Sequence, residues 1–285
     1  MGNFVNIAFD IVSFSAIIVL VVLGLGVIAS MIGIFNFAHG EFVLLGAYVV
    51  FLFHSNGLPA WAGMLVAPFV VGAIGYLLER TVIHRFYATP VIAMLGTYAL
   101  GLTIREIVRS LTGGLYHAIP EPLVGSWSMG DFNIAKWRAV IIVVTLLVIA
   151  ATWVFLTRSS YGLRVRASLE NPSLARASGI STARLYAMTF AFGAALAGLA
   201  GALMVPLFSL YADLGVRFLI QSFLAVMLGG VGTFEGPILG GAIVGGISAS
   251  LPWLVPPVLA DVLVFVIAIT IVKLRPQGLL KAGRI

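Results

Sequence analysis

The sequence IVSFSAIIVLVVLGLGVIASMIGIFN, residues 11–36, contains no charged side chain. It is longer than the roughly 20 apolar residues that a helix needs to cross the hydrocarbon layer of a membrane. Apolar stretches recur from there to Val272, and the 285 residues are 61% hydrophobic and only 9% charged. Soluble domains have roughly 45–50% apolar and about 25% charged residues. Most of the chain is therefore predicted to lie inside a lipid bilayer.

The membrane segments are predicted to be helices. A membrane barrel would show segments of about ten residues with alternating polar and apolar positions, and these stretches lack that alternation. We expect an all-α fold, a polytopic transmembrane helical bundle with broken or re-entrant helices, forming one domain over residues 1–285 with eight or nine membrane helices. The segment 218–232 is short and broken by glycine, so it either crosses or re-enters. The nine predicted spans are approximately residues 11–30, 34–54, 61–78, 91–110, 137–156, 185–208, 218–232, 237–255 and 260–273.

Positive charges predict the orientation, because cytoplasmic connections carry an excess of Lys and Arg. The connections of one side hold only Lys136, Arg138 and Arg217, so the N-terminus is expected outside and the C-terminus in the cytoplasm, across a cytoplasmic (inner) membrane. The net charge of +6 is then a result of topology rather than a sign of nucleic-acid binding. Eleven of the 16 basic residues fall on the other side: Arg80, Arg85, Arg158, Arg164, Arg166, Arg176, Arg184, Lys273, Arg275, Lys281 and Arg284.

The segment GIFNFAHGEFVLLGAY, residues 33–48, brings polar residues to membrane depth. The twelve apolar residues that follow Glu41 would form a helix only about 18 Å long, so the crossing must include Asn36, His39 and Glu41. Polar groups at this depth are costly unless they face protein or water. We expect a broken helix, flexible at Gly40, that lines a translocation pathway. The alternative is that His39 and Glu41 lie at the headgroup interface, paired with each other.

A second interruption is expected in LAVMLGGVGTFEGPILGGAIVGG, residues 224–246. One helix should end near Gly229 and the next should begin near Pro237. Glu235 lies at the start of the new helix, where the helix dipole favours a carboxylate, and is expected to shape a gate or vestibule of the pathway. Gly241 and Gly245 form a GxxxG pair that is expected to pack against another helix, inside this chain or in a second subunit.

Arg105 is the remaining candidate for the pathway. It lies in TIREIVRS, residues 103–110, about 22 Å along the fourth span. Its side chain either snorkels outward or points into the pathway. Glu106 and Arg109 are three residues apart and can pair on one face of the helix.

Two connections are long enough to hold structure of their own. Residues 111–136 are rich in glycine and proline and are expected to form an irregular loop or cap outside the membrane. In the inner connection 157–184, Asn171 followed by Pro172 predicts a helix start, Gly179 predicts its end about seven residues later, and Ser181 can cap the next span. A helix this short is unstable alone in water, so we expect it to dock on a partner rather than only to touch lipid headgroups.

Three segments, NFAHGEFVLLGAY, VRASLENPSLARASGI and MLGGVGTFEGPILGG, closely resemble the ABC importer permeases for branched-chain amino acids, specifically the smaller of the two related permease subunits. The resemblance covers almost the whole chain. One departure is Leu169-Glu170-Asn171, where the general importer pattern has a Glu-Ala-Ala run. The resemblance implies that the loop contains the coupling helix, which seats in a cleft of an ATPase. The residues that it assigns to ATPase coupling are Arg166, Glu170, Asn171, Arg176 and Gly179.

The resemblance also implies the partners and the mechanism. They are a homologous second permease, two cytoplasmic ATPases that bind ATP and Mg²⁺, and an extracytoplasmic substrate-binding protein. ATP-driven alternating access would move the substrate, and this chain would carry no cofactor and perform no covalent chemistry. The absence of a GxxxxGK[ST] sequence agrees with ATP hydrolysis on another polypeptide.

Two other functions remain open from the sequence. The first is a secondary transporter driven by an ion gradient, with His39, Glu41 or Glu235 as proton carriers. The second is an ABC permease for urea or short amides. An intramembrane enzyme or a metal site is not predicted, since the spans contain no GxSxG or HExxH sequence.

Overall fold

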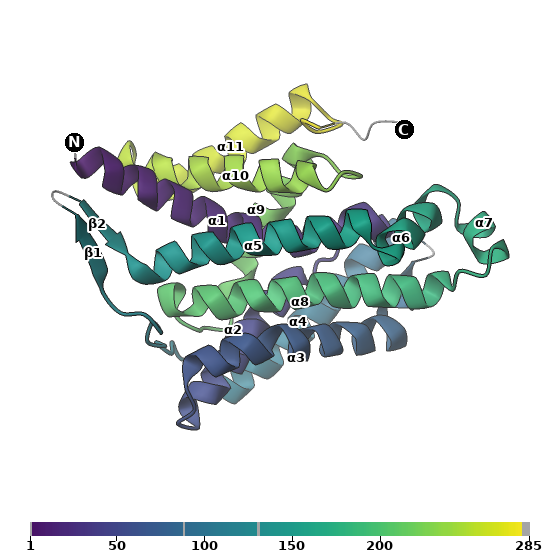
Figure 1. The fold of residues 1–285 in the computed structure, drawn as a ribbon, viewed down its shortest axis with the longest axis horizontal. Coiled ribbons are helices and arrows are strands. Elements are labelled where there is room, and N and C mark those ends of the chain that lie inside the picture. The colour runs from purple at the N-terminus through teal and green to yellow at the C-terminus, as the bar shows by residue number, and fades with distance from the viewer. Residues whose placement is uncertain (1, 88, 130–131, 281–285) are drawn as a thin grey trace.

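The computed structural model describes residues 2–87, 89–129 and 132–280, and it shows a bundle of helices (Figure 1). Each of the nine predicted spans corresponds to a long helix, so the prediction of an all-α polytopic bundle is confirmed. Five of them are long and apolar enough to cross a membrane. The nine helices are α1 (Gly2–Ile32), α2 (His39–Ser55), α3 (Ala60–Thr81), α4 (Pro90–Thr112), α5 (Lys136–Arg158), α8 (Thr182–Phe208), α9 (Leu214–Gly229), α10 (Glu235–Ser250) and α11 (Pro257–Leu274).

Short elements fill the connections. Two 3₁₀ turns, η1 (Ile83–Phe86) and η2 (Leu251–Trp253), precede α4 and α11. Helices α6 (Ser160–Glu170) and α7 (Pro172–Ala177) join α5 to α8. Helices α6 and α7 lie at one end of the bundle, and the N-terminus lies at the opposite end (Figure 1).

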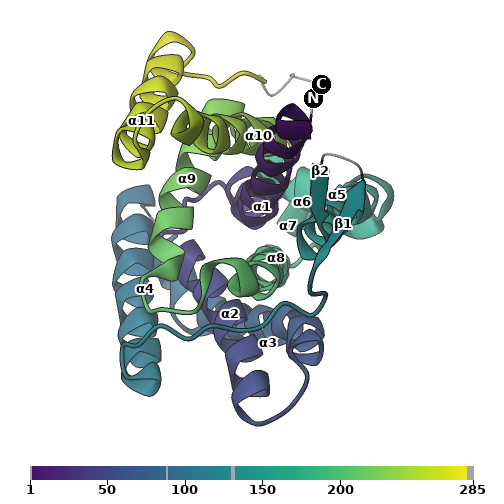
Figure 2. The same cartoon turned by 90° about the vertical axis from the view of Figure 1, so that its left-hand side faces the viewer.

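Helices α1 and α8 form the centre of the bundle. About 72% of the apolar window of α1 and 67% of that of α8 are buried, against 33% for α3, 28% for α4 and 22% for α5. Figure 2 shows α1 and α8 side by side with the other helices around them. The three less buried helices carry many exposed apolar side chains, such as Phe69, Leu95 and Leu147. These are the surfaces that suit lipid or a second apolar subunit.

Glycines allow the central helices to approach closely. A Cβ atom placed on Gly201 of α8 would lie only 1.8 Å from the backbone oxygen of Val43 in α2. The GxxxG pair of α10 packs against α1, since a Cβ on Gly245 would lie 2.6 Å from Cα of Ser15 and one on Gly241 would lie 3.2 Å from Cα of Val19. The predicted use of this pair in helix packing is confirmed, and its partner is inside this chain.

The outer connection is more regular than expected. Residues 126–135 contain an antiparallel pair, β1 (Ser126–Met129) and β2 (Phe132–Ala135), with Trp127 opposite Ile134. The prediction of an irregular loop or cap is therefore wrong for the residues of this hairpin, where a short alternation of apolar and polar residues favours strands. The backbone N–H of Asn133 donates to Oδ1 of Asn6, 3.1 Å away, which ties the hairpin to α1.

The close packing of α10 on α1 predicts different effects for two adjacent glycines. Gly245→Ala should lower the free energy of unfolding by about 1–3 kcal/mol, because the added methyl group meets the backbone of α1. Gly246→Ala is the control, since a Cβ there lies 3.7 Å from the hydroxyl of Ser15 at ordinary contact distance. The measurement is the fraction of monodisperse protein in detergent after heating. Equal melting of both variants would contradict the packing.

Candidate functional site

The chain re-enters the bundle between α1 and α2. Helix α1 ends before Gly33, which has a φ of 80°, and residues 33–38 are not helical. Nε2 of His39, the first residue of α2, then lies 2.9 Å from the backbone oxygen of Val21. Val21 is eleven residues before the end of α1, or about 16 Å along its axis. The non-helical segment therefore runs back to the middle of the bundle before α2 begins.

This geometry confirms a broken crossing, but the break lies before α2 rather than at Gly40. Gly40 was expected to supply it, whereas Gly40 lies inside α2 and the interruption covers residues 33–38. Gly40 instead allows close packing, because a Cβ there would lie 2.4 Å from the backbone oxygen of Gly215 in α9. The first turns of α2 and α9 therefore meet, and both present the positive ends of their dipoles to the same region.

The polar residues of the re-entrant segment are buried. Asn36, His39 and Glu41 have none of their surface exposed. Oδ1 of Asn36 accepts a hydrogen bond from the backbone N–H of Ala38 at 3.0 Å. The alternative in which His39 and Glu41 pair at the headgroup interface is wrong, because His39 contacts the backbone of α1 and Glu41 pairs with Arg105 of α4.

An ion network begins at this buried carboxylate. Nε of Arg105 donates to Oε1 of Glu41 at 3.0 Å, and Nη2 of Arg105 donates to the same oxygen. Nη1 of Arg105 also lies 3.8 Å from Oδ1 of Asp213, which accepts from Nη2 of Arg109 at 2.9 Å. Arg109 pairs in turn with Glu106 at 3.1 Å, as predicted. Arg105 thus points inward, and the network leads from the core to the exposed ends of α4 and α9.

Several polar atoms of this cluster have no hydrogen-bond partner among the described residues. They are Nδ2 of Asn36, Nδ1 of His39 and Oε2 of Glu41. A buried polar atom without a partner costs about 1–3 kcal/mol. Native proteins contain few such atoms, and each calls for an explanation such as bound water or a functional role. Three of them within six residues therefore mark the break as a candidate functional site.

Glu235 lies apart from this cluster. It is the first residue of α10 and it is exposed. Helix α9 ends at Gly229, as predicted, and the interruption before α10 is tied to α1 because the hydroxyl of Ser30 donates to the backbone oxygen of Thr233 at 3.1 Å. Of the five predicted pathway residues, the structure brings together Asn36, His39, Glu41 and Arg105 but not Glu235.

The predicted short helix is present as α7, six residues long. Oδ1 of Asn171 accepts from the backbone N–H of Leu174 at 2.9 Å, and Pro172 is the first helical residue. At the other end, Gly179 has a φ of 84° and donates to the oxygen of Arg176, while Ile180 donates to that of Ala175, both at 3.0 Å. These two bonds make a Schellman motif, so both predicted ends are confirmed.

The rest of this connection holds more structure than expected. Helix α6 was not predicted; its signal was Ser159, whose hydroxyl accepts from the backbone N–H of Gly162 at 3.1 Å. Nη1 of Arg166 donates to the oxygen of Leu156 at the end of α5. Glu170 ends α6, and both Glu170 and Arg176 are exposed. Ser181 occupies the N-cap position of α8, but its side chain makes no capping bond, contrary to expectation.

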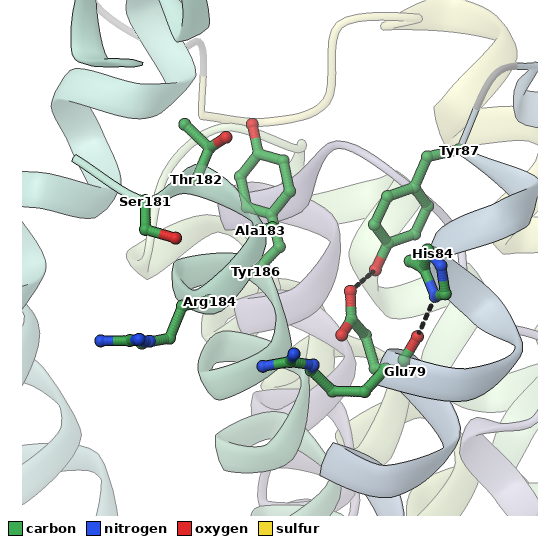
Figure 3. Close-up of a pocket in the computed structure, with 9 residues that line it drawn as sticks. Glu79, His84, Tyr87, Ser181, Thr182, Ala183, Arg184 and Tyr186 are labelled. Atoms are coloured by element: carbon green, nitrogen blue, oxygen red, sulfur yellow. Dashed lines mark hydrogen bonds between the residues drawn. The ribbon is translucent and has the colours of Figure 1, made fainter. Parts of the chain in front are cut away.

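A pocket of about 490 Å³ opens beside this connection, between η1 and the start of α8 (Figure 3). The hydroxyl of Tyr87 donates to Oε1 of Glu79 at 3.1 Å, and Nδ1 of His84 lies 3.0 Å from the backbone oxygen of Glu79. Burial, together with the nearby Glu79, raises the pKa of Tyr87 far above its usual value, so this phenol remains protonated. Arg80 and Arg184 also line the pocket and add positive charge to this end.

Sequence reasoning missed two charged residues. Arg217 was placed in an outer connection, but α9 begins at Leu214, so Arg217 lies within its first turn. Its Nη2 lies 3.7 Å from Oδ1 of Asp261 in α11. Asp261 fell inside a predicted span, and an ionisable residue within a span is by itself an indication of function. Across the described ranges, no three His, Cys, Asp or Glu side chains come together as metal ligands would.

The network predicts that Glu41 depends on Arg105. Arg105→Met should lower the free energy of unfolding by about 3–5 kcal/mol, because it leaves a buried carboxylate without its partner. Arg109→Met is the matched control, and its exposed pair with Asp213 should contribute about 0–1 kcal/mol. Denaturation in detergent measures both, and the double variant Glu41→Gln with Arg105→Met should recover much of the loss. A double variant no more stable than Arg105→Met would contradict the pairing.

Comparison with known proteins identifies the family. A family model described as "Branched-chain amino acid transport system / permease component" matches residues 7–272. The chain is 28% identical to the high-affinity branched-chain amino acid transport system permease protein LivH of Escherichia coli (strain K12), over 97% of this chain and 95% of that protein. It is also 28% identical to LivM of the same organism, another permease protein of the same description, over 79% of this chain and 59% of that protein.

Among solved structures, PsaBC from Streptococcus pneumoniae in complex with Fab aligns with a TM-score of 0.49 and 17% sequence identity, over 93% of this chain and 94% of that chain. The family assignment rests on the family model, which covers nearly all of the helical bundle. The chain belongs to the family of branched-chain amino acid transport system permease components.

Proposed function

We propose that this chain is the channel-forming permease subunit of an ATP-driven ABC importer for branched-chain or similar amino acids. The observation that carries the proposal is α7, a six-residue helix with both ends closed by specific hydrogen bonds. Such a helix needs external support in water. In this proposal α7 docks on a cytoplasmic ATPase and transmits its movement to the bundle, while this chain performs no covalent chemistry and holds no cofactor.

Exposed apolar side chains around α7 support docking on a protein. Leu174 of α7 is 63% exposed and Leu163 of α6 is 62% exposed. Because α7 buries only Ala175 against its own chain, the apolar face of Leu174 is available to a partner. Arg176 and Glu170 flank it with charges of both signs, which suit the polar rim of an interface.

The proposed assembly has four kinds of subunit. A second, homologous permease is supported by the similarity of this chain to both LivH and LivM of one organism. Two ATPases would bind ATP and Mg²⁺ on the cytoplasmic side, where α7 and the C-terminus are proposed to lie, and a substrate-binding protein would deliver the amino acid on the other side. The N-terminus is then outside, and the protein lies in the cytoplasmic (inner) membrane.

The two interrupted crossings suit alternating access. Asn36, His39, Glu41 and Arg105 are proposed to line the middle of the pathway, and Glu235 its cytoplasmic mouth. Helix α9 connects these two regions, since it begins beside Gly40 and ends at the interruption before α10. Movement of α9 would displace the middle of the pathway and its cytoplasmic mouth together. Coupling of an ATPase to the pathway requires a concerted movement of this kind. The separation of Glu235 from His39 and Glu41 disfavours a proton relay through these residues.

The proposal is tested with the tagged chain purified from its native membrane in mild detergent. Co-purification of two nucleotide-binding subunits and a related permease, identified by mass spectrometry, is expected. The assembled complex in proteoliposomes should then take up radiolabelled leucine only when ATP and the binding protein are both supplied. Uptake by the chain alone, driven by an ion gradient without ATP, would refute the proposal.

The cap of α7 predicts a specific loss of coupling. Gly179→Val should abolish most substrate-stimulated ATP hydrolysis, because a β-branched residue is strained at a φ of 84° and the Schellman motif would open. The control is Gly57→Val, since Gly57 lies in the α2–α3 connection with a φ of 75°. At both glycines an added Cβ would meet no atom of the described residues within 4 Å. Stimulated ATPase activity is measured in the assembled complex. Equal activity of both variants would contradict a coupling role for α7.

A further inference from the structure

A pocket of about 380 Å³ lies between α9 and α11 and is lined by both charged and apolar side chains. It is distinct from the Glu41 cluster, although Asp213 borders both. Figure 2 shows α9 with α4 on one side and α11 on the other. The volume lies within the range of small-molecule pockets, roughly 300–1,000 Å³. Its wall is formed by Asp213, Val216, Arg217, Ile220, Gln221 and Asp261, with Val264 and Phe265.

The two opposite charges of this pocket lie near the starts of their helices and far from the C-terminal ends. Arg217 is twelve residues before the end of α9, and Asp261 is thirteen residues before the end of α11. These separations correspond to about 18 Å and 20 Å along the axes, within a hydrocarbon layer about 30 Å thick. Charged groups at such depth face water or protein, because facing lipid costs several kcal/mol. The pocket therefore combines two opposite charges with the apolar side chains of two helices that the sequence predicts to lie in the membrane.

Arg217 and Asp261 retain their hydrogen-bonding capacity. Their closest atoms are 3.7 Å apart, which is longer than a hydrogen bond, and their side chains are 51% and 57% exposed. Asp213, by contrast, already accepts two hydrogen bonds from Arg109. Within the part of the chain that the structure describes, Arg217 and Asp261 form no other ion pair. A guanidinium and a carboxylate are thus both available to a ligand of mixed charge.

Gln221 supplies a second, independent indication of a ligand. Gln221 is only 5% exposed and lines the pocket, yet its Oε1 accepts no hydrogen bond from any described residue. An unsatisfied buried oxygen is costly and calls for a donor. A ligand with an ammonium group would supply one.

We propose that this pocket binds the transported amino acid as a zwitterion. Its carboxylate would pair with Arg217, its ammonium group with Asp261 and Oε1 of Gln221, and its apolar side chain would contact Val216, Ile220 and Phe265. The inference rests on the proposed function, since it assigns the site at which that importer holds its substrate. Arg217 of α9 and Asp261 of α11 would then be substrate-binding residues next to the ion network of Glu41.

The test measures binding of radiolabelled leucine to the assembled complex without its binding protein, in the nucleotide-free state and with a non-hydrolysable ATP analogue. Binding is expected in at least one state. Leucinamide, which lacks the carboxylate, and 4-methylpentanoate, which lacks the ammonium group, should compete poorly. Arg217→Gln and Asp261→Asn should each weaken binding by about tenfold or more, because each removes a charge-assisted contact.

Two further variants separate binding from structure. Gln221→Met should weaken leucine binding while leaving stability in detergent unchanged or higher, because it removes an unsatisfied buried oxygen. Arg138→Gln is the matched control: Arg138 pairs with Asp10 at 2.5 Å, with both side chains about 40% exposed, and lines none of this pocket. It should leave binding unchanged.

The outcomes distinguish the site from the function. If the wild-type complex takes up leucine with ATP but binds none in either state, or if Arg217→Gln binds normally, the pocket assignment is overturned and the importer stands. If Arg217→Gln instead loses the second permease on purification, the pocket is a subunit contact and the assignment also fails. If the wild-type complex shows no ATP-driven uptake, the proposed function itself fails.

Discussion

Backbone and side-chain polar groups cannot be left facing hydrocarbon, and the non-helical segment 33–38 is the place where this structure must satisfy that constraint. The backbone N–H of Phe37 donates to Oγ1 of Thr97 in α4 at 3.1 Å. Phe37 also packs on Phe223 of α9, with ring centroids 4.6 Å apart. The segment is thus enclosed by α1, α4 and α9. These helices supply hydrogen-bond and packing partners for the non-helical segment, and this is why the crossing can be interrupted here.

The enclosure depends in turn on close helix packing. Gly40 and Gly215 bring the first turns of α2 and α9 into contact, and Gly201 lets α8 lie directly on α2. Leucine or valine at these positions would push the helices apart. The hydrogen bonds of the re-entrant segment would then lengthen beyond the range of about 2.7–3.2 Å that is normal for N–H···O bonds. Small residues at the crossings and polar residues at the break are therefore parts of one arrangement.

Helix α9 links the regions that carry function in this proposal. Its N-cap residue Asp213 belongs to the Glu41 network, and Asp213 and the first-turn residue Arg217 both line the proposed amino acid pocket. Its last residues, Leu228 and Gly229, accept hydrogen bonds from Leu279 and Leu280 of the C-terminal segment at 2.9 Å and 3.0 Å. A shift of α9 along its axis would therefore move the proposed substrate pocket, the interruption before α10 and the C-terminal segment together. This is the kind of rigid element that alternating access requires.

The sequence alone determined the membrane class, the nine helices and both ends of α7, because apolar length, proline, glycine and capping residues act within a few neighbouring positions. It also predicted that Asn36, His39 and Glu41 lie at depth, since the apolar run after Glu41 is too short to cross. Only the tertiary structure decided that Glu41 pairs with Arg105, 64 residues away, and that Arg217 meets Asp261. No local pattern encodes such pairs, because the partner of a buried charge is set by which helices pack together.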